Sequence, residues 1–301
     1  MPELPDIVVY VEALASRIAG ARLEHIRLGS PFVLRTVEPT LREAEGKRVQ
    51  GVRRLGKRIV TELEGELCLV IHLMVAGRLR WLAPGAPIPK RHGLCAFDFA
   101  PGTLVLVEAG TKRRASLHLV RGAQGLAALD RGGMEVLGST RAAFAAALGR
   151  ENHTLKRALT DPRLFSGIGN AYSDEILHRA RLSPVKLTSA LDDDETARLH
   201  QACHDVLREW TDRLRRETAG GFPEKLTAFR DGMAVHGRFR QPCPACGAPV
   251  QRIVHANNET NYCVRCQTGG RLLADRALSR LLRKDWPRSL EELDELAARK
   301  D

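Results

Sequence analysis

The sequence predicts an α+β protein of several domains, with a β-rich N-terminal domain, a helical domain and a short cysteine-bearing module. Three observations support this. Period-two apolar patterns dominate from about residue 22 to residue 120. Helical periodicity takes over after Ser139, and two Cys-x2-Cys pairs follow near residue 250. A chain of 301 residues is long enough for two domains with separate cores.

The N-terminal domain is expected to open with a helix and continue as a β-sandwich or barrel. Apolar residues recur every three or four positions between Ile7 and Ile18, so a helix capped by Asp6 should end near Gly20. Turn residues at Glu64-Gly65 and Pro101-Gly102 separate the strands. The clearest predicted strands are Arg58–Leu63, Glu66–Leu73, Arg78–Leu82, Leu94–Phe99 and Thr103–Val107.

The second half of the chain is predicted to be mainly helical. Helices are expected at Ser139–Leu148, Thr154–Leu159, Asn170–Arg181 and Leu191–Glu217. The expected domain limits are 1–120 for the N-terminal domain, 121–138 for a hinge, 139–235 for the helical domain, 236–268 for the cysteine module and 269–301 for a helical extension. Ser289 should cap the last helix, which either packs back onto the protein or binds a protein partner.

The net charge of +11 favours a polyanionic partner, nucleic acid first and an anionic membrane surface second. There is no run of 18 apolar residues, so no segment is expected to span a bilayer. The start PELPD lacks a basic and then apolar leader, so a signal peptide is not expected. Seven cysteines without a secretory signal indicate a reducing compartment. We therefore expect a cytoplasmic protein.

Four cysteines have the spacing of a zinc ribbon, Cys243-x2-Cys246-x16-Cys263-x2-Cys266. Four thiolates form the tetrahedral donor set that Zn²⁺ prefers in structural sites. The set leaves no open coordination position, so one structural zinc ion per chain is expected. The alternatives are a redox pair or unrelated thiols. Cys68, Cys95 and Cys203 lie in strand or helix patterns and are expected in the core.

The first residues carry a second chemical signal. If Met1 is removed, Pro2 becomes a secondary amine at the N-terminus, and an α-amino group has a pKa of roughly 7.7–8. Such an amine can attack an electrophilic sugar carbon and form an iminium, and the adjacent Glu3 could move protons for it. The alternative is a short extended leader before the first helix.

A glycine-rich loop, Gly167-Ile168-Gly169-Asn170, stands directly before a predicted helix. Glycines let backbone N–H groups approach a phosphate, and the helix N-terminus adds partial positive charge. Asn170 could cap the helix or donate its amide to a phosphate. The alternative is a turn that only connects two helices and binds no ligand.

Four separated features then coincide: the PELPD start, Lys57 after Gly56, the GIGNAY loop and the C-terminal four-cysteine ribbon. Together they resemble the formamidopyrimidine-DNA glycosylase/endonuclease VIII family of base-excision repair enzymes over about residues 1–268. His72-Leu73 with Gly77-x-Leu79 also looks like a family strand segment. The resemblance implies a β-sandwich, a helix-two-turns-helix domain and a zinc finger.

The resemblance also implies the roles of individual residues. Pro2 would attack C1′ of a flipped, oxidised or ring-opened nucleotide, Glu3 would transfer protons, and β- or β,δ-elimination would cut the strand. Lys57 and Asn170 would hold the phosphates beside the lesion, and His72 would lie at the DNA. The partner would be double-stranded damaged DNA, bound by a monomer in the bacterial cytoplasm or nucleoid.

The chain departs from the family pattern at several positions. Met74 or Val75 would fill the gap left by the flipped base. Lys112 and Arg113 could serve the opposite strand, but a wedge aromatic is missing there. Asn258 stands where the family usually has an arginine that grips the lesion phosphate. The departures at Asn258 and at residues 108–114 keep open a non-catalytic damaged-DNA-binding protein. A zinc-ribbon RNA- or ribosome-binding protein is another alternative, but it leaves Pro2, Glu3 and Lys57 unexplained.

Overall fold

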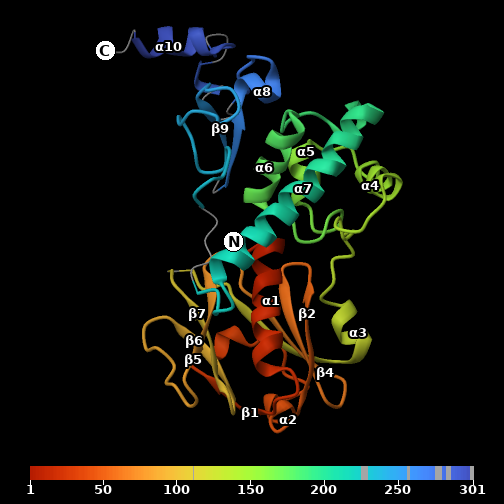
Figure 1. The fold of residues 1–301 in the computed structure, drawn as a ribbon, viewed down its shortest axis with the longest axis vertical. Coiled ribbons are helices and arrows are strands. Elements are labelled where there is room, and N and C mark those ends of the chain that lie inside the picture. The colour runs from red at the N-terminus through yellow and green to blue at the C-terminus, as the bar shows by residue number, and fades with distance from the viewer. Residues whose placement is uncertain (111, 225–229, 256–257, 275–279, 283–285, 299–301) are drawn as a thin grey trace. The chain divides into compact units, whose positions relative to one another are not determined.

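A computed structural model describes residues 1–110, 112–224, 230–255, 258–274, 280–282 and 286–298 (Figure 1). The chain forms two compact units. The first comprises Met1–Gly133 with Arg208–Ala228, and the second comprises Met134–Leu207 with Phe229–Asp301. The domain limits expected from the sequence stay a prediction.

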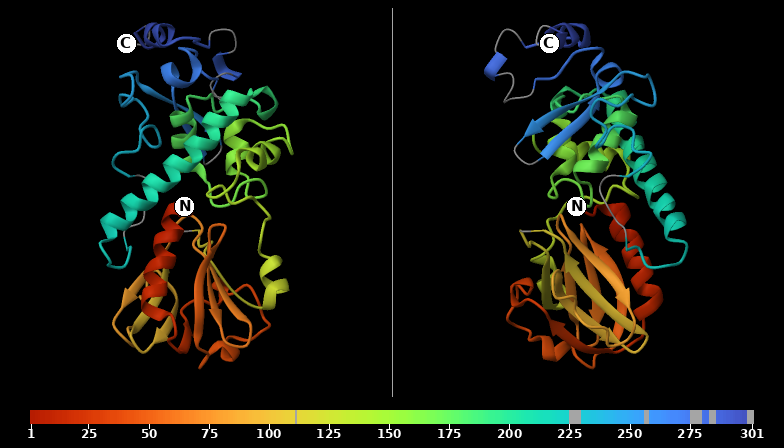
Figure 2. Two further views of the ribbon diagram at one scale, coloured as in Figure 1. Left: turned by 45° about the vertical axis from the view of Figure 1, so that its right-hand side comes forward. Right: turned by 90° about the vertical axis from the view of Figure 1, so that its left-hand side faces the viewer.

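The first unit is a β-sandwich of two four-stranded sheets, in which every neighbouring pair of strands is antiparallel. One sheet has the order β1-β6-β7-β5 and the other β2-β3-β4-β8. Figure 2 shows the two sheets with α1 along the sandwich. The strands are β1 (Leu23–Leu28), β2 (Val49–Leu55), β3 (Arg58–Leu63), β4 (Leu67–His72), β5 (Gly77–Leu82), β6 (Gly93–Phe99), β7 (Gly102–Glu108) and β8 (Ser116–Arg121).

One hydrophobic core joins the sheets to α1 (Leu4–Ile18). Tyr10 and Leu14 on the helix are fully buried, as are Ile59 and Phe97 on the two sheets. The apolar positions of α1 recur at helical spacing, so one face of the helix fills the sandwich. The expected sandwich with a leading helix is confirmed.

The expected cap of this helix is wrong. Asp6 is not the N-cap; α1 begins at Leu4, and Glu3 is the N-cap. The backbone N–H of Glu3 donates to the Asp6 carboxylate at 2.8 Å, which is half of a capping box. Pro5 is tolerated because the first turn of a helix does not use its backbone N–H groups within the helix.

The first unit also contains the C-terminal part of α7 (Asp193–Thr218) and the segment after it. Arg215 pairs with Glu12 of α1 at 2.6 Å, and Leu214 enters the core. The Phe222 ring lies 5.7 Å from the Tyr10 ring. Shorter elements of this unit are η1 (Pro31–Val33), α2 (Leu41–Ala44) and α3 (Gly122–Ala127), the last within the expected hinge.

The second unit places a helical cluster against a β-hairpin. Its helices are α4 (Arg141–Leu148), α5 (Leu155–Thr160), α6 (Asn170–Ala180), η2 (Thr188–Ala190) and the first part of α7. The hairpin pairs β9 (Val250–His255) with β10 (Asn258–Cys263), and α8 (Val264–Thr268) follows at once. The long expected helices therefore agree closely with those of the structure.

The C-terminal extension packs onto the cysteine module. Ser289 caps α10 (Leu290–Ala298), since its hydroxyl accepts from the Glu292 N–H at 3.3 Å. Leu290 and Leu293 pack against the apolar cluster beneath the hairpin. The other expected apolar position of this helix, Leu296, has a side chain outside the described part. Among the described helices, none combines the length and apolar character needed to cross a bilayer.

Gly77 provides a stability test of the turn between β4 and β5. A Cβ atom there would lie 2.3 Å from the Leu73 carbonyl oxygen, so Gly77→Ala must displace backbone. Overpacking of this kind costs about 1–3 kcal/mol. We expect urea unfolding at a correspondingly lower midpoint. Gly51→Ala is the matched control, because its new Cβ meets only the end of the Glu62 side chain at 3.1 Å. Equal midpoints for Gly77→Ala and wild type would contradict the expectation.

Candidate active site and zinc centre

The N-terminal residues are buried in the first unit. Pro2 and Glu3 are both buried, and Glu3 is only 2% exposed. The Glu3 carbonyl accepts from the Ile7 N–H at 2.9 Å, while its own N–H binds Asp6. These contacts hold the backbone of Glu3 at the start of α1, and Pro2 directly precedes it. The chain start is thus part of a folded body.

Charged groups surround the N-terminal amine. Burial is the main cause that lowers the pKa of the Met1 amino group, and the positive charges of Arg78 and Lys57 lower this pKa further. Glu3 and Asp6 act in the opposite direction. The first unit therefore brings Lys57 within electrostatic reach of the N-terminal amine, although Lys57 lies more than 50 positions further along the chain.

Lys57 follows Gly56 in the turn between β2 and β3, where Gly56 has a φ of +61°. The next residue, Arg58, pairs with His72 across β3 and β4. Burial, with the nearby charges of Arg58 and Lys57, lowers the pKa of His72 to about 4. His72 is therefore a neutral imidazole at physiological pH.

The turn after β4 presents the two residues expected to fill a gap in DNA. Met74 has a left-handed φ of +53°, and Val75 is 58% exposed. Strain of this kind in a non-glycine residue is typical of functional turns. The turn is joined to β5, where Gly77 pairs with Glu108 of β7.

Lys112 and Arg113 lie in the loop after β7, and both are exposed. The loop is tied to the buried Glu108 carboxylate, which accepts from the backbone N–H groups of Arg114 and Ala115 at 2.9 and 3.0 Å. Arg113 donates to the Arg91 carbonyl at 3.0 Å. The neighbouring Thr111 lies outside the described residues.

In the second unit, the glycine-rich loop leads into α6. Gly169 is the N-cap and Asn170 is the first helical residue, so Asn170 is not the cap that one alternative proposed. Its side-chain Nδ2 donates to the Glu259 carbonyl of β10 at 3.0 Å. Asn258, beside Glu259, is exposed at the start of the same strand. The structure thus joins the glycine-rich loop to the hairpin that carries Asn258.

The four ribbon cysteines converge at the base of the hairpin, with their sulfur atoms within 4.8 Å of one another. The Cys243–Cys266 and Cys246–Cys263 sulfur distances are 4.0 and 3.3 Å. A tetrahedral Zn²⁺ with bonds of about 2.3 Å places its sulfur ligands about 3.8 Å apart, so the donor set fits. None of the four forms a disulfide.

This cluster is a structural zinc site. Zinc bound by four thiolates holds the module together and presents no open position for catalysis. The remaining cysteines, Cys68, Cys95 and Cys203, are buried, as expected.

Sequence reasoning missed the acidic pair Asp174 and Glu175 on α6. Asp174 is fully buried and contacts Lys156 and the His236 ring, the latter at 2.8 Å. Glu175 accepts from three successive backbone N–H groups, those of residues 234–236, at 2.7–2.9 Å. In the sequence, the pair is visible only as two adjacent acids within a predicted amphipathic helix.

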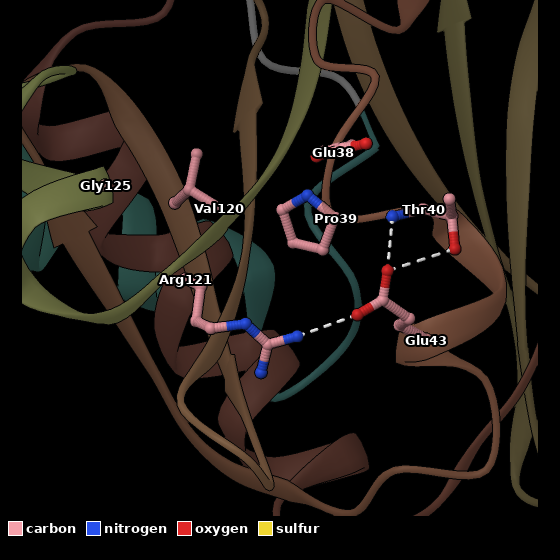
Figure 3. A pocket seen from close by; sticks show the side chains of 7 residues that line it. All are labelled: Glu38, Pro39, Thr40, Glu43, Val120, Arg121 and Gly125. Atoms are coloured by element: carbon pink, nitrogen blue, oxygen red, sulfur yellow. Dashed lines mark hydrogen bonds and ion pairs between the residues drawn. The ribbon is translucent and has the colours of Figure 1, made fainter.

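A separate pocket of about 500 Å³ lies in the first unit (Figure 3). The Arg121–Glu43 ion pair, at 2.7 Å, lies in its wall. The lining shares no residue with the predicted site, and we assign it no role. It is lined by Glu38, Pro39, Thr40, Glu43, Val120, Arg121 and Gly125.

Three protein-family models match the chain. They are the formamidopyrimidine-DNA glycosylase N-terminal domain at residues 1–115, the formamidopyrimidine-DNA glycosylase H2TH domain at 135–215, and the zinc finger found in FPG and IleRS at 240–269. The family models thus match, in order, the sandwich, the helical cluster and the cysteine module.

Curated relatives agree with this assignment. The chain is 34% identical over 284 residues to formamidopyrimidine-DNA glycosylase of Thermus thermophilus, covering 90% of this chain and 100% of the relative. It is 33% identical over 277 residues to that of Heliobacterium modesticaldum, covering 89% and 100%.

Solved structures are also similar. A complex of Lactococcus lactis Fpg with abasic-site-containing DNA gives a TM-score of 0.77 at 26% identity, covering 88% of this chain and 99% of that chain. The crystal structure of the Thermus thermophilus MutM (Fpg) protein gives 0.75 at 33% identity, covering 88% and 98%.

Metal removal tests the zinc centre. Purified protein should contain about one zinc ion per chain, and a strong chelator should expose four additional reactive thiols. Cys68, Cys95 and Cys203 should stay unreactive, because each is buried and none belongs to the four-cysteine cluster. Metal-free protein with four readily reactive thiols before chelation would contradict the assignment.

The low pKa of His72 predicts a specific pH dependence of stability. The unfolded chain binds a proton to this ring below about pH 6.5, whereas the folded protein does so only near pH 4. Stability should therefore fall as the pH drops from 6.5 towards 4 and be independent of this group above pH 7. His72→Gln should flatten the urea-unfolding free energy in that window.

Burial also lowers the pKa of His118. The unfolding free energy of His72→Gln should therefore keep the smaller pH dependence that His118 contributes. The direct check is the imidazole titration of His72 by NMR. A midpoint near 6.5 would contradict the prediction.

Proposed function

Because the chain belongs to the formamidopyrimidine-DNA glycosylase family, we propose that it is a base-excision-repair glycosylase with AP-lyase activity and that Pro2 is its nucleophile. The observation that carries this proposal is the burial of Pro2 and Glu3 at the chain start, where the charge of Lys57 reaches the N-terminal amine. Removal of Met1 is a requirement of the mechanism. The substrate class is oxidised or ring-opened bases in double-stranded DNA.

The reaction begins at C1′ of a nucleotide that has left the base stack. The Pro2 nitrogen forms a bond to C1′ as the glycosidic bond breaks, and the released base takes up a proton. Opening of the sugar ring gives an iminium, with a proton delivered to the ring oxygen. Glu3, next to Pro2 in the chain, would transfer these protons. Loss of a C2′ proton then expels the 3′-phosphate, and a second elimination can expel the 5′-phosphate.

The electrostatic setting supports an amine nucleophile. The environment that lowers the pKa of the Met1 amine would act in the same direction on a Pro2 amine exposed by Met1 removal. A lower pKa raises the neutral, nucleophilic fraction at pH 7. Lys57 would contribute to this effect while binding a phosphate beside the lesion.

The remaining predicted residues are assigned to DNA binding. Asn170 would contact a phosphate, and His72 would lie at the DNA. Met74 or Val75 would fill the position vacated by the flipped base, and Lys112 and Arg113 would face the opposite strand. Asn258 would contact the DNA backbone through an uncharged amide side chain. We propose a monomer acting on DNA in the bacterial cytoplasm or nucleoid.

Borohydride trapping on a duplex with one abasic site tests the proposal. Wild type should give a covalent enzyme–DNA adduct. Pro2→Gly should lower its yield sharply, because a primary amine then replaces the secondary amine that forms the iminium. Glu3→Gln should bind the duplex but turn over an oxidised-base substrate slowly.

Lys90→Gln, a lysine outside the proposed site, is the control and should trap like wild type. A protein with a confirmed Pro2 N-terminus that binds tightly but never traps would favour the non-catalytic alternative, for which the uncharged Asn258 is the supporting observation.

Asn258→Arg tests the departure at the hairpin. An added charge-assisted phosphate contact is worth about 1.5–3 kcal/mol, or roughly 10- to 150-fold in affinity. The slope of log affinity against log salt should steepen by about 0.9. Asn258→Gln, which adds length without charge, should change neither quantity appreciably. An unchanged salt slope in Asn258→Arg would place this residue away from the DNA backbone.

A further inference from the structure

Four side chains of α6 bind the segment that leads into and forms the cysteine module. Asn170, Asp174, Glu175 and His178 each bind a group of the segment 234–263. The first three contacts use the Glu259 carbonyl, the His236 ring and the backbone of residues 234–236. The fourth joins His178 Nε2 to the sulfur of Cys243 at 3.2 Å. Spacings of four and eight residues place Asn170, Asp174 and His178 along one side of the helix.

Zinc binding would fix which atom donates in the contact between His178 and Cys243. A zinc-bound cysteine is a thiolate, which carries no proton and can only accept a hydrogen bond. The proton between the two atoms must therefore reside on His178 Nε2. Cys243 is 2% exposed, so water has little access to replace this donor.

We propose that His178 is a positioning residue of the zinc centre, donating its Nε2–H to the Cys243 thiolate and thereby retaining the metal. The hydrogen bond stabilises the thiolate in its ligating orientation and disperses part of its negative charge. Groups that orient a ligand in this way typically contribute 10- to 100-fold to metal affinity. The inference concerns zinc retention and is independent of the proposed glycosylase chemistry.

The arrangement has a structural consequence. Asn170 lies in the first turn of α6 and His178 in its last turn. The same helix therefore begins at the glycine-rich loop and contacts a zinc ligand near its end. Weak attachment of Cys243 would loosen the hairpin from the C-terminal end of α6 first. Asp174 and Glu175 would still hold the segment 234–236.

The test compares His178→Phe with His178→Gln in the full-length zinc protein. Phe retains a ring but no donor, whereas Gln retains an N–H donor. Zinc transfer to an excess of chromophoric chelator should be about 10–100 times faster for Phe, with Gln closer to wild type. His153→Phe, in the same unit and outside the module, is the matched control and should release zinc at the wild-type rate.

Cobalt substitution supplies a spectroscopic readout. A thiolate that has lost a hydrogen bond gives up its electron more readily, so the sulfur-to-cobalt band of His178→Phe should move to longer wavelength. The Gln variant should keep the wild-type band. Unchanged zinc release together with an unchanged cobalt band in His178→Phe would overturn the proposal.

A measurement on wild-type protein keeps the proposal testable if His178→Phe fails to fold. Nitrogen-15 NMR of the histidine rings in the zinc-loaded protein reports which ring nitrogen carries hydrogen. A protonated Nε2 on His178 is expected. An unprotonated Nε2 would exclude donation to Cys243 and overturn the inference.

Discussion

The contact on which the candidate active site depends is the short buried hydrogen bond between the Glu3 N–H and the Asp6 carboxylate. It closes the first turn of α1 and holds the backbone of Glu3, and therefore of Pro2, in one place. A chain terminus without such an anchor would sample many conformations, and ordering it at each turnover would cost conformational entropy. Here the sandwich core fixes the helix, and the helix positions the amine beside its charged neighbours.

In the second unit, too, a single helix positions several groups. One helix, α6, begins at the glycine-rich loop and carries two buried carboxylates that bind the segment leading into the cysteine module. Burying carboxylates is unfavourable unless hydrogen bonds or opposite charges compensate. Glu175 has three N–H donors, and Asp174 has Lys156 and His236 as partners. The module is consequently attached through specific polar contacts as well as through its small apolar core.

Much of the fold could be predicted from local patterns. The strand at Arg58–Leu63 was located to the residue, and the cysteine spacing identified the zinc site, because both signals are short-range. The cap at Asp6 was misplaced because proline in a first helical turn looks like a break, although that turn needs no N–H donors within the helix. The glycine-rich loop was found, but the use of Asn170 to bind Glu259 was not, since its partner lies 89 residues away.

The parts of the site that sequence reasoning could not supply are set by non-local contacts. The depressed pKa of His72 arises from burial and from cations on another strand and turn. His178 reads as an ordinary helical residue until the fold places Cys243 beside it. Such roles depend on which elements the core brings together, and no spacing rule along the chain encodes them.

The attachment site of the nucleotide can be read by peptide mass spectrometry of the borohydride-reduced enzyme–DNA adduct. After nuclease and protease digestion, the deoxyribose remnant is expected on the peptide that begins at Pro2, with Met1 absent. A remnant attached to a lysine, or to a peptide that retains Met1, would contradict the assignment of the N-terminal proline as the nucleophile.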